Sequence, residues 1–310
     1  MASQTLAEAK KLINNQIVAG VAEDIISVNP LFDILPFFGY SGQGLIVNAE
    51  STLGDAQVLA VDTTITAKAA AAYTQQVFTA TKIIGDAEMD SLVQAQSASA
   101  GVDQLAQEIS SKAKSVGLKF GNGMFNGTGT SPQLNSLHSM VDASQYTTAS
   151  AGQALSFALL DELLDLVYVG GRNADFLTMA PRTIRSYKNL LRALGGASIN
   201  EVITLPTGRT VIGYEGIPIF KSTEQSVVET QNGAALSGGA LTSIFAGCFD
   251  SGDLRSGLMG IHPASVPAGI EVVPVGQQEA KDSEIWRVRW MANTALTNRK
   301  ALARLPSINN

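Results

Sequence analysis

The stretch that decides the fold is GDAEMDSLVQAQSASAGVDQLAQEISSKAKSVGLKFGNGMFNGTGT, residues 85–130. At its start Asp86 can cap a helix, and the carboxylate of Glu88 would meet the positive end of the helix dipole. Apolar side chains then recur at helical spacing; they are Met89, Leu92, Val93, Val102, Leu105, Ala106, Ile109, Ala113 and Val116. The pattern predicts one helix of about thirty residues, about 45 Å long at the standard rise per residue.

The last turn predicts where this helix ends. Lys112 and Lys114 lie where cations are favoured, and Gly117 is a natural left-handed C-terminal cap. The segment after it, LKFGNGMFNGTGTSPQLNSL, is rich in Gly and Asn and predicts a loop. A solitary helix of this length needs other elements to pack against, so the rest of the chain should supply them.

The composition limits what the rest can be. The chain has 310 residues, enough for one large domain or two modest ones. Charged residues make up only 15% of it, against about a quarter in typical soluble domains. Two explanations remain open: a neutral surface rich in small residues, or a surface buried against other copies of the chain.

Several classes of partner are disfavoured. The net charge of −6, without a run of basic residues, argues against a nucleic-acid grip, because phosphate binding needs clustered Lys and Arg. The start MASQTLAEAKKL lacks the regions of a signal peptide, and no apolar stretch is long enough to cross a membrane. The single cysteine, Cys248, is expected to be a buried structural thiol.

The chain begins with a predicted amphipathic helix over residues 5–27, which Asn29-Pro30 stops. A long two-stranded excursion is predicted next, leaving the body near residues 39–44 and returning near Ile83. Strand-like runs occur at 45–47, 58–61, 63–66 and 75–84, and the only helix signal is a short Ala run after Lys68. An isolated two-stranded ribbon is marginal in water, so it must pack on its own domain or lie across another subunit. Its few charges favour the second.

Residues 150–265 have α/β character. Helices are predicted over 156–167 and from Pro181 to a Gly195-Gly196 stop, and strands over 174–180, 201–205, 209–214, 217–220 and 243–249. The polar stretch 222–239 predicts a surface loop. Strands return at 270–275 and 284–297, and in the latter Trp286, Val288 and Trp290 alternate with Arg287 and Arg289. Because strands come before and after it, the α/β region should be an insertion.

No constellation of residues predicts catalysis. His138 and His262 have no Cys or carboxylate at metal-ligand spacing, so structural roles are expected for both. The acidic Asp161, Glu162 and Asp165 fall on the polar face of a helix, and GNGMFNGTG fits no phosphate-binding fingerprint. We therefore predict no enzyme, no catalytic, cofactor-binding or metal site, and no cofactor.

The motifs follow one another in a recognisable order. After an arm ending in NPLFDILPF and the excursion come GDAEMDSL, FNGTGTSPQLNSL, NADFLTMAPRTIRSYKNL, GYEGIPIFKS, IFAGCFDSGD and RVRWMANTALTNRKALARL. This series covers nearly the whole chain and resembles the major capsid proteins of tailed bacteriophages with the Hong Kong 97-type fold. The resemblance implies an α+β fold with an N-arm, an E-loop β-hairpin, a peripheral domain with a long spine helix, and an axial α/β domain.

The resemblance also assigns the parts of the chain. Residues 1–37 would be the N-terminal arm, 38–84 the E-loop, 85–135 and 267–310 the peripheral domain, and 136–266 the axial domain. Contacts around the hexamer and pentamer axes would come from residues 222–239 or from SGDLRSGLMG, residues 251–260. Lys68 is the only lysine in the loop, and no partner asparagine or catalytic glutamate can be assigned by motif, so no covalent crosslink is predicted.

The function implied by the resemblance is structural. The chain would assemble with itself into hexamers and pentamers of an icosahedral shell that encloses double-stranded DNA without specific binding. It would lie in the virion after assembly in the host cytoplasm, with portal, decoration or separate scaffolding proteins as further partners and no membrane. Two alternatives remain: an encapsulin-type nanocompartment with the same fold, and an α/β enzyme whose scattered site includes Asp161, Arg182 and His262.

Overall fold

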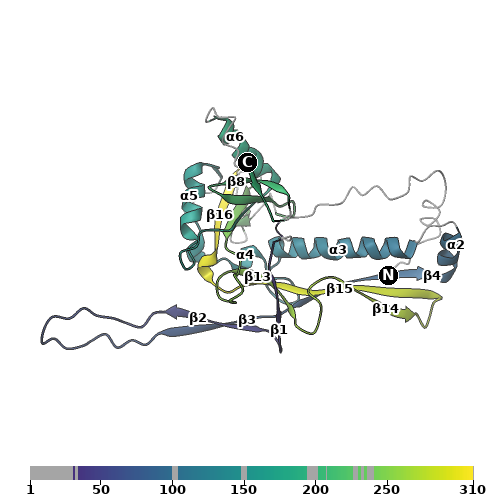
Figure 1. Ribbon diagram of the computed structural model, residues 1–310, viewed down its shortest axis with the longest axis horizontal. Helices are drawn as coiled ribbons and strands as arrows, with labels where there is room; N and C mark the ends of the chain where they lie inside the picture. Colours follow the sequence, from purple (N-terminus) through teal and green to yellow (C-terminus); the bar gives the residue numbers. More distant parts are fainter. Residues whose placement is uncertain are drawn as a thin grey trace.

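The computed structural model describes residues 31, 34–99, 104–147, 152–193, 202–206, 208–225, 230–231, 234–235 and 241–309. The helix predicted over residues 5–27 and much of the loop 222–239 lie outside this part. Figure 1 shows a narrow ribbon projecting to one side and a long layer of helix α3 (Gln104–Asn126) and strands extending to the other. A block of sheet and helices stands above the junction between them. No helix of the described part is both long and apolar enough to cross a membrane.

The long layer is built on β15 (Ser283–Leu296), the inner strand of a five-stranded sheet. It pairs antiparallel with β4 (Thr81–Asp90), β13 (Leu258–Pro263) and β14 (Glu271–Gln277), and β13 pairs in parallel with β1 (Phe37–Tyr40). Val288 lies opposite Gly85, where a Cβ would point toward α3 and come within 3.6 Å of the Lys112 side chain. The predicted alternation is therefore confirmed, with Trp286, Val288 and Trp290 toward the helix and the two arginines away from it.

Helix α3 is held on this sheet by an aromatic cluster. The ring centroids of Phe120 and Trp290 lie 4.4 Å apart, and Phe37 lies 6.1 Å from Phe120 and 5.9 Å from Trp290. Ala292 and Leu134 complete the cluster and are buried. Burial of these large side chains, more than helix propensity, fixes α3 across the strands.

The predicted start of the helix is wrong. GDAEMD forms the end of β4, in which Ala87 and Met89 are buried and Asp86 lies opposite Arg287 of β15. Helix begins only afterwards, with α2 (Ser91–Ser99) and then α3. Ten residues of pairing with β15 outweigh the local capping signal of the acidic side chains.

The predicted end of the helix is also wrong, because α3 continues through Gly117 to Asn126. Phe120, Met124 and Phe125 are buried, and their packing stabilises the two additional turns. Gly123 lies where Leu134 crosses the helix, and a Cβ there would come within 2.2 Å of Leu134 Cδ1. The glycines in this segment therefore serve close packing as well as turns.

The block contains a seven-stranded sheet in the order β5-β16-β12-β6-β9-β8-β7. Its strands are β5 (Gln153–Ala154), β6 (Phe176–Met179), β7 (Val202–Thr204), β8 (Thr210–Tyr214), β9 (Ile217–Lys221), β12 (Leu241–Gly247) and β16 (Leu302–Asn309). Helices α5 (Phe157–Leu166) and α6 (Pro181–Ala193) contribute side chains to the main core. The predicted helices and strands of this region are confirmed, and the predicted stop at Gly195-Gly196 lies outside the described residues. The remaining short elements are α4 (Leu137–Met140), β10 (Thr230–Gln231), β11 (Ala234–Ala235), and 3₁₀ helices at Ala143–Gln145 and Arg299–Ala301.

Two strands lie in a different sheet from the one that the sequence suggested. β16 falls within residues 267–310, assigned to the peripheral domain, yet it pairs with β12 and β5 of the seven-stranded sheet. β13 falls within residues 136–266, assigned to the axial domain, yet it pairs with β15 and β1. The chain thus crosses between the two sheets more often than a single insertion would require.

Candidate assembly interface

The projecting ribbon consists of residues 45–78, in which β2 (Leu45–Thr52) and β3 (Ala72–Phe78) pair antiparallel. The predicted two-stranded excursion is confirmed. The runs 58–61 and 63–66 are not strands, however, and no helix follows Lys68. Only the half of the ribbon nearest the body is a regular ladder.

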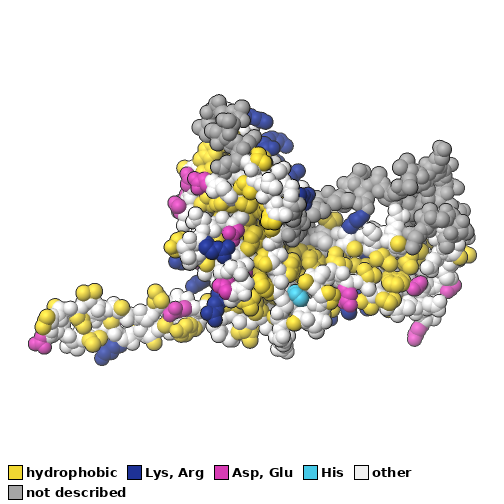
Figure 2. Space-filling view, in the orientation of Figure 1, with side chains coloured by type: hydrophobic (Ala, Val, Ile, Leu, Met, Phe, Trp, Pro, Cys, Tyr) yellow, Lys and Arg dark blue, Asp and Glu magenta, His cyan; other side chains and the backbone are white. Residues whose placement is uncertain are grey.

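Apolar side chains of the ribbon face solvent. Val58 and Val61 are fully exposed, at 101% and 100%, and the other exposed members are Ile46, Leu53, Leu59, Ile65, Tyr73 and Val77. The ribbon carries four charged residues, Glu50, Asp55, Asp62 and Lys68, and Figure 2 shows hydrophobic side chains along its length. Fully burying one such aliphatic side chain contributes about 1.5–3 kcal/mol, so the ribbon has much to gain from being covered.

Hydrogen bonds join the two sides of the ribbon in its outer half. The backbone N–H of Asp55 donates to the carbonyl of Ala69 at 3.0 Å. The side-chain oxygen of Gln57 accepts from the N–H of Thr66 at 2.9 Å and from that of Ala67 at 3.0 Å. One side chain thus holds the two sides together where the ladder is absent.

The base of the ribbon is anchored to the five-stranded sheet. The Tyr40 hydroxyl accepts from the N–H of Ala80 at 3.0 Å, and the Asn293 side chain donates to the carbonyl of Thr79 at 2.8 Å. Leu45 and Phe78 pack against Met259, Ile261 and Ala295, which are buried. These contacts fix the direction in which the ribbon leaves the body.

A cleft of about 760 Å³ lies beside this base. It is lined by residues 45–50 of β2, residues 253–255 and residues 297–300. SGDLRSGLMG, one of the two segments predicted to make axial contacts, therefore lies against the ribbon, and its last three residues belong to β13.

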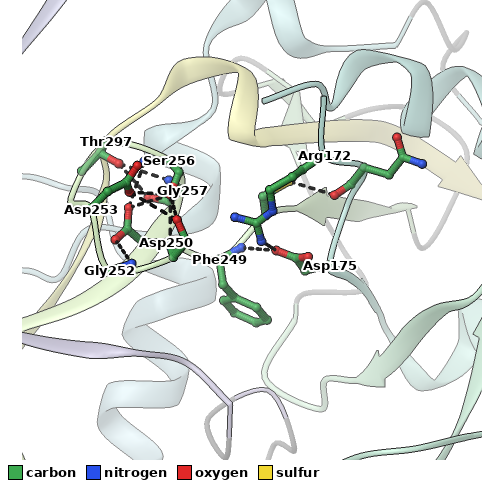
Figure 3. Close-up of polar contacts among 12 residues, drawn as sticks. Arg172, Asp175, Phe249, Asp250, Gly252, Asp253, Ser256, Gly257 and Thr297 are labelled. Atoms are coloured by element: carbon green, nitrogen blue, oxygen red, sulfur yellow. Dashed lines mark hydrogen bonds and ion pairs between the residues drawn. The ribbon is translucent and has the colours of Figure 1, made fainter. Parts of the chain in front are cut away.

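A polar network holds this segment in shape (Figure 3). The buried Asp250 carboxylate accepts from the backbone N–H groups of Gly252, Leu254 and Ser256 at 2.9–3.0 Å. The Ser256 hydroxyl and the N–H of Arg255 keep the pKa of Asp253 below its usual value. The carboxylates of Asp250 and Asp253 both accept hydrogen bonds from the same loop, so these acidic residues stabilise its conformation.

The interior holds the cysteine. Cys248 is fully buried, and its thiol donates to the carbonyl of Asn173 at 3.2 Å. Burial raises the pKa of this thiol to about 11, and the nearby Asp175 carboxylate adds to the effect. The predicted buried structural thiol is confirmed.

The residues of the alternative enzyme site are spread over different elements. Asp161 lies in α5 and accepts a hydrogen bond from the Tyr214 hydroxyl, Arg182 lies in α6, and His262 lies in β13. His262 Nδ1 is 3.0 Å from the carbonyl oxygens of both Pro263 and Val266, and no hydrogen bond joins it to Asp161 in the described part.

The other histidine and the carboxylates form no recognisable centre either. The His138 ring packs edge-on against Phe245, with centroids 4.8 Å apart. Among the residues that the structure describes, no three His, Cys, Asp or Glu side chains lie close enough to hold a metal ion together. The feature that stands out is the ribbon with the cleft at its base, which the sequence predicted only as an excursion.

The fold is similar to known structures over its whole length. No family model and no curated protein matches the sequence. The SrpI encapsulin from Synechococcus elongatus shares 17% identity and a TM-score of 0.72, with 100% of this chain and 97% of that chain covered. The capsid of the native GTA particle shares 13% identity and a TM-score of 0.63, with 99% of both chains covered. The capsid of Myoviridae phage XM1 shares 13% identity and a TM-score of 0.62, with 97% of this chain and 98% of that chain covered.

Proposed function

We propose that this chain, which has the Hong Kong 97-type phage capsid fold, is a structural shell subunit that assembles with itself into hexamers and pentamers. The single observation that carries the proposal is the ribbon. Val58 and Val61 are fully exposed, and the contacts of Tyr40 and Asn293 hold the base so that the ribbon extends away from the body. A neighbouring copy beneath the ribbon would bury the apolar side chains that its own chain cannot reach.

The closed icosahedral shell would enclose double-stranded DNA. The net charge of −6 supports a wall that holds the genome without gripping it, because a strongly basic wall would oppose release. The protein would be part of the virion after assembly in the host cytoplasm, with portal, scaffolding or decoration proteins as further partners. We propose no enzymatic activity and no cofactor, and the buried, unreactive Cys248 thiol is consistent with this.

The parts of the subunit follow the same proposal. Residues 1–37 would be the N-terminal arm and 38–84 the E-loop, which includes the ribbon. The peripheral domain would be 85–135 and 267–310, and the axial domain 136–266. Two strands are exceptions: β13 pairs within the five-stranded sheet of the peripheral part, and β16 pairs within the seven-stranded sheet of the axial part. Lys68 would be a solubilising charge, and denaturing gels of assembled particles should show no ladder of crosslinked subunits.

The experiment that tests the function is the particle mass of the purified protein, by sedimentation with negative-stain microscopy. Closed shells, or hexamers and pentamers that convert to shells, are expected. A stable species of 32.4 kDa, or a dimer, that forms nothing larger at high concentration would contradict the proposal.

A second candidate is an encapsulin-type compartment, favoured by the match to the SrpI encapsulin over the whole chain. Both candidates form shells, so particle mass does not separate them. The contents do: nuclease-protected DNA inside particles from the native source supports the capsid, and a co-purifying protein cargo with no DNA supports the compartment.

A further inference from the structure

Helix α6 carries a line of basic side chains on its solvent face, namely Arg182, Arg185, Lys188 and Arg192. At 100° per residue the four fall within an arc of about 120°. The buried residues Thr183, Tyr187 and Leu191 recur every four positions and hold the opposite face against the block. The basic face is therefore fixed in orientation by the core.

Helix α5 carries the opposite charge. Asp161 and Asp165 are one helical turn apart and exposed, and Glu162 lies beside them. Leu159, Leu160 and Leu163 are buried beneath. The Tyr214 hydroxyl donates to Asp161, which orients that carboxylate.

The two charged faces lie on different flanks of the block. In Figure 2 acidic side chains gather over α5 on one side, and basic side chains gather over and beside α6 on the other. No ion pair in the described part joins Asp165 to Arg185 or to Arg192. Within one chain the complementary faces thus point in different directions.

We propose that these faces meet between copies, the acidic face of α5 in one subunit contacting the basic face of α6 in the next. This inference rests on the proposed function and adds to it the residues that join neighbouring subunits in the ring. Because the contact joins two different surfaces, each added subunit repeats the same rotation, and a rotation that divides a full turn closes the series into a ring. Exposed ion pairs are individually weak and screened by salt, so they set register and encounter rate while apolar contacts supply affinity.

A nucleic acid is the competing occupant of the basic face. The matching acidic face on the same chain and the net charge of −6 favour a second copy. The two occupants differ in what a charge reversal does: it blocks ring formation in one case, and it reduces DNA retention by rings that still form in the other.

The test uses three variants of the full chain. Arg182→Glu, Arg185→Glu, Lys188→Glu and Arg192→Glu together give a chain with two acidic faces, and Asp161→Lys, Glu162→Lys and Asp165→Lys together give one with two basic faces. Each is expected to lower the yield of rings about tenfold or more at low salt, through like-charge repulsion. The third variant combines all seven changes, restores complementarity with the signs exchanged, and is expected to assemble as the wild type does. Lys119→Glu, a charge reversal at an exposed position of α3 outside both faces, is the control and should also assemble.

Mixing the first two variants gives a second test. An alternating ring has an attractive contact at every position, so rings with an even number of subunits close. A five-membered ring cannot alternate and must contain one like-charge contact. The equimolar mixture is therefore expected to form hexamers and to be depleted in pentamers, as native mass spectrometry would count.

The outcomes are separable. Variants with one reversed face that melt like the wild type yet form rings at its yield would overturn the inference. A seven-change variant that folds but does not assemble would also overturn it. Rings of normal yield that retain less DNA would assign the basic face to nucleic acid and also overturn it. If the wild type itself forms nothing above a dimer, the proposed function fails first.

Discussion

Arg287 on β15 and Asp86 on β4 lie directly opposite each other, and two hydrogen bonds of 2.9 Å join the guanidinium to the carboxylate. The pair lies on the face of the five-stranded sheet away from α3, beside the ion pair between Arg289 and Glu271. The Arg287 hydrogen bond holds the pKa of the Asp86 carboxyl below its usual value. The same carboxylate that looked like a helix cap in the sequence is thus part of a strand pairing.

Asp86→Asn should lower the free energy of unfolding of the unassembled subunit by about 1 kcal/mol at neutral pH, since half-exposed charged pairs are partly screened. Because the folded pKa is depressed, the stabilisation is present above the unfolded pKa of about 3.9 and is lost as pH falls through the folded pKa. Urea unfolding at pH 7 and at pH 3 measures this, with Asp62→Asn on the exposed ribbon as control. A difference between variant and wild type that stays constant down to pH 3 would contradict the role of the ionised pair.

Phe120→Ala should lower the free energy of unfolding by about 3–5 kcal/mol, because the ring is buried against Trp290 and Phe37 and its removal leaves a cavity. Lys119→Ala, at the exposed neighbouring position of the same helix, should change it by less than about 0.5 kcal/mol. Urea titration with an unchanged slope distinguishes lost stability from a changed unfolded state. Equal effects for the two substitutions would mean that the aromatic cluster does not hold α3.

Gly117 and Gly123 provide a matched pair within α3. Gly117→Ala should stabilise the subunit by about 0.5–1 kcal/mol, because a Cβ there meets no atom within 4 Å and alanine favours helix. Gly123→Ala should destabilise it by about 1–3 kcal/mol, because the new Cβ would meet Leu134. Thermal melts of both variants give the sign directly, and two shifts in the same direction would disprove the close packing at Gly123.

Val61→Asp tests the ribbon. The side chain is fully exposed, so the stability of the isolated subunit should change by less than about 0.5 kcal/mol. Shell yield should fall about tenfold or more, because burying a carboxylate under a neighbour is costly. Thr64→Asp adds the same charge at an exposed polar position of the ribbon and should be milder. Equal yields for Val61→Asp and wild type in sedimentation would show that the ribbon is not an interface.

Some of this structure could be predicted from the sequence because apolar side chains recur with the period of the strand or helix that buries them. Trp286, Val288 and Trp290 face the helix because their strand lies between core and solvent, and that alternation is local information. The helices around Leu160 and Tyr187 were readable for the same reason. The ribbon was predicted from a run of strand-like residues with few charges, and the structure has two strands there.

The errors have a common physical origin in contacts between distant parts of the chain. Asp86 carries a capping signal, but Arg287 lies 201 positions away and only the folded sheet brings them together. Gly117 looks like a helix stop until Phe120 and Met124 are seen to be buried beyond it. Val58 and Val61 match a strand pattern, yet residues 53–71 form no ladder in the described part of the chain. The cleft joins residues 45–50 to residues 297–300, which no local pattern could indicate.

The position of β15 and β16 also bears on when a subunit can exist at all. Each is an inner strand of its sheet, and each comes later in the chain than the strands with which it pairs. A chain still emerging from the ribosome lacks an inner strand of both sheets and also lacks Asn293, which holds the base of the ribbon. Neither sheet can form in full before residues 283–309 are synthesised, so chains truncated before them should be unable to join a growing particle. Folding of this region therefore acts as a checkpoint for polymerisation.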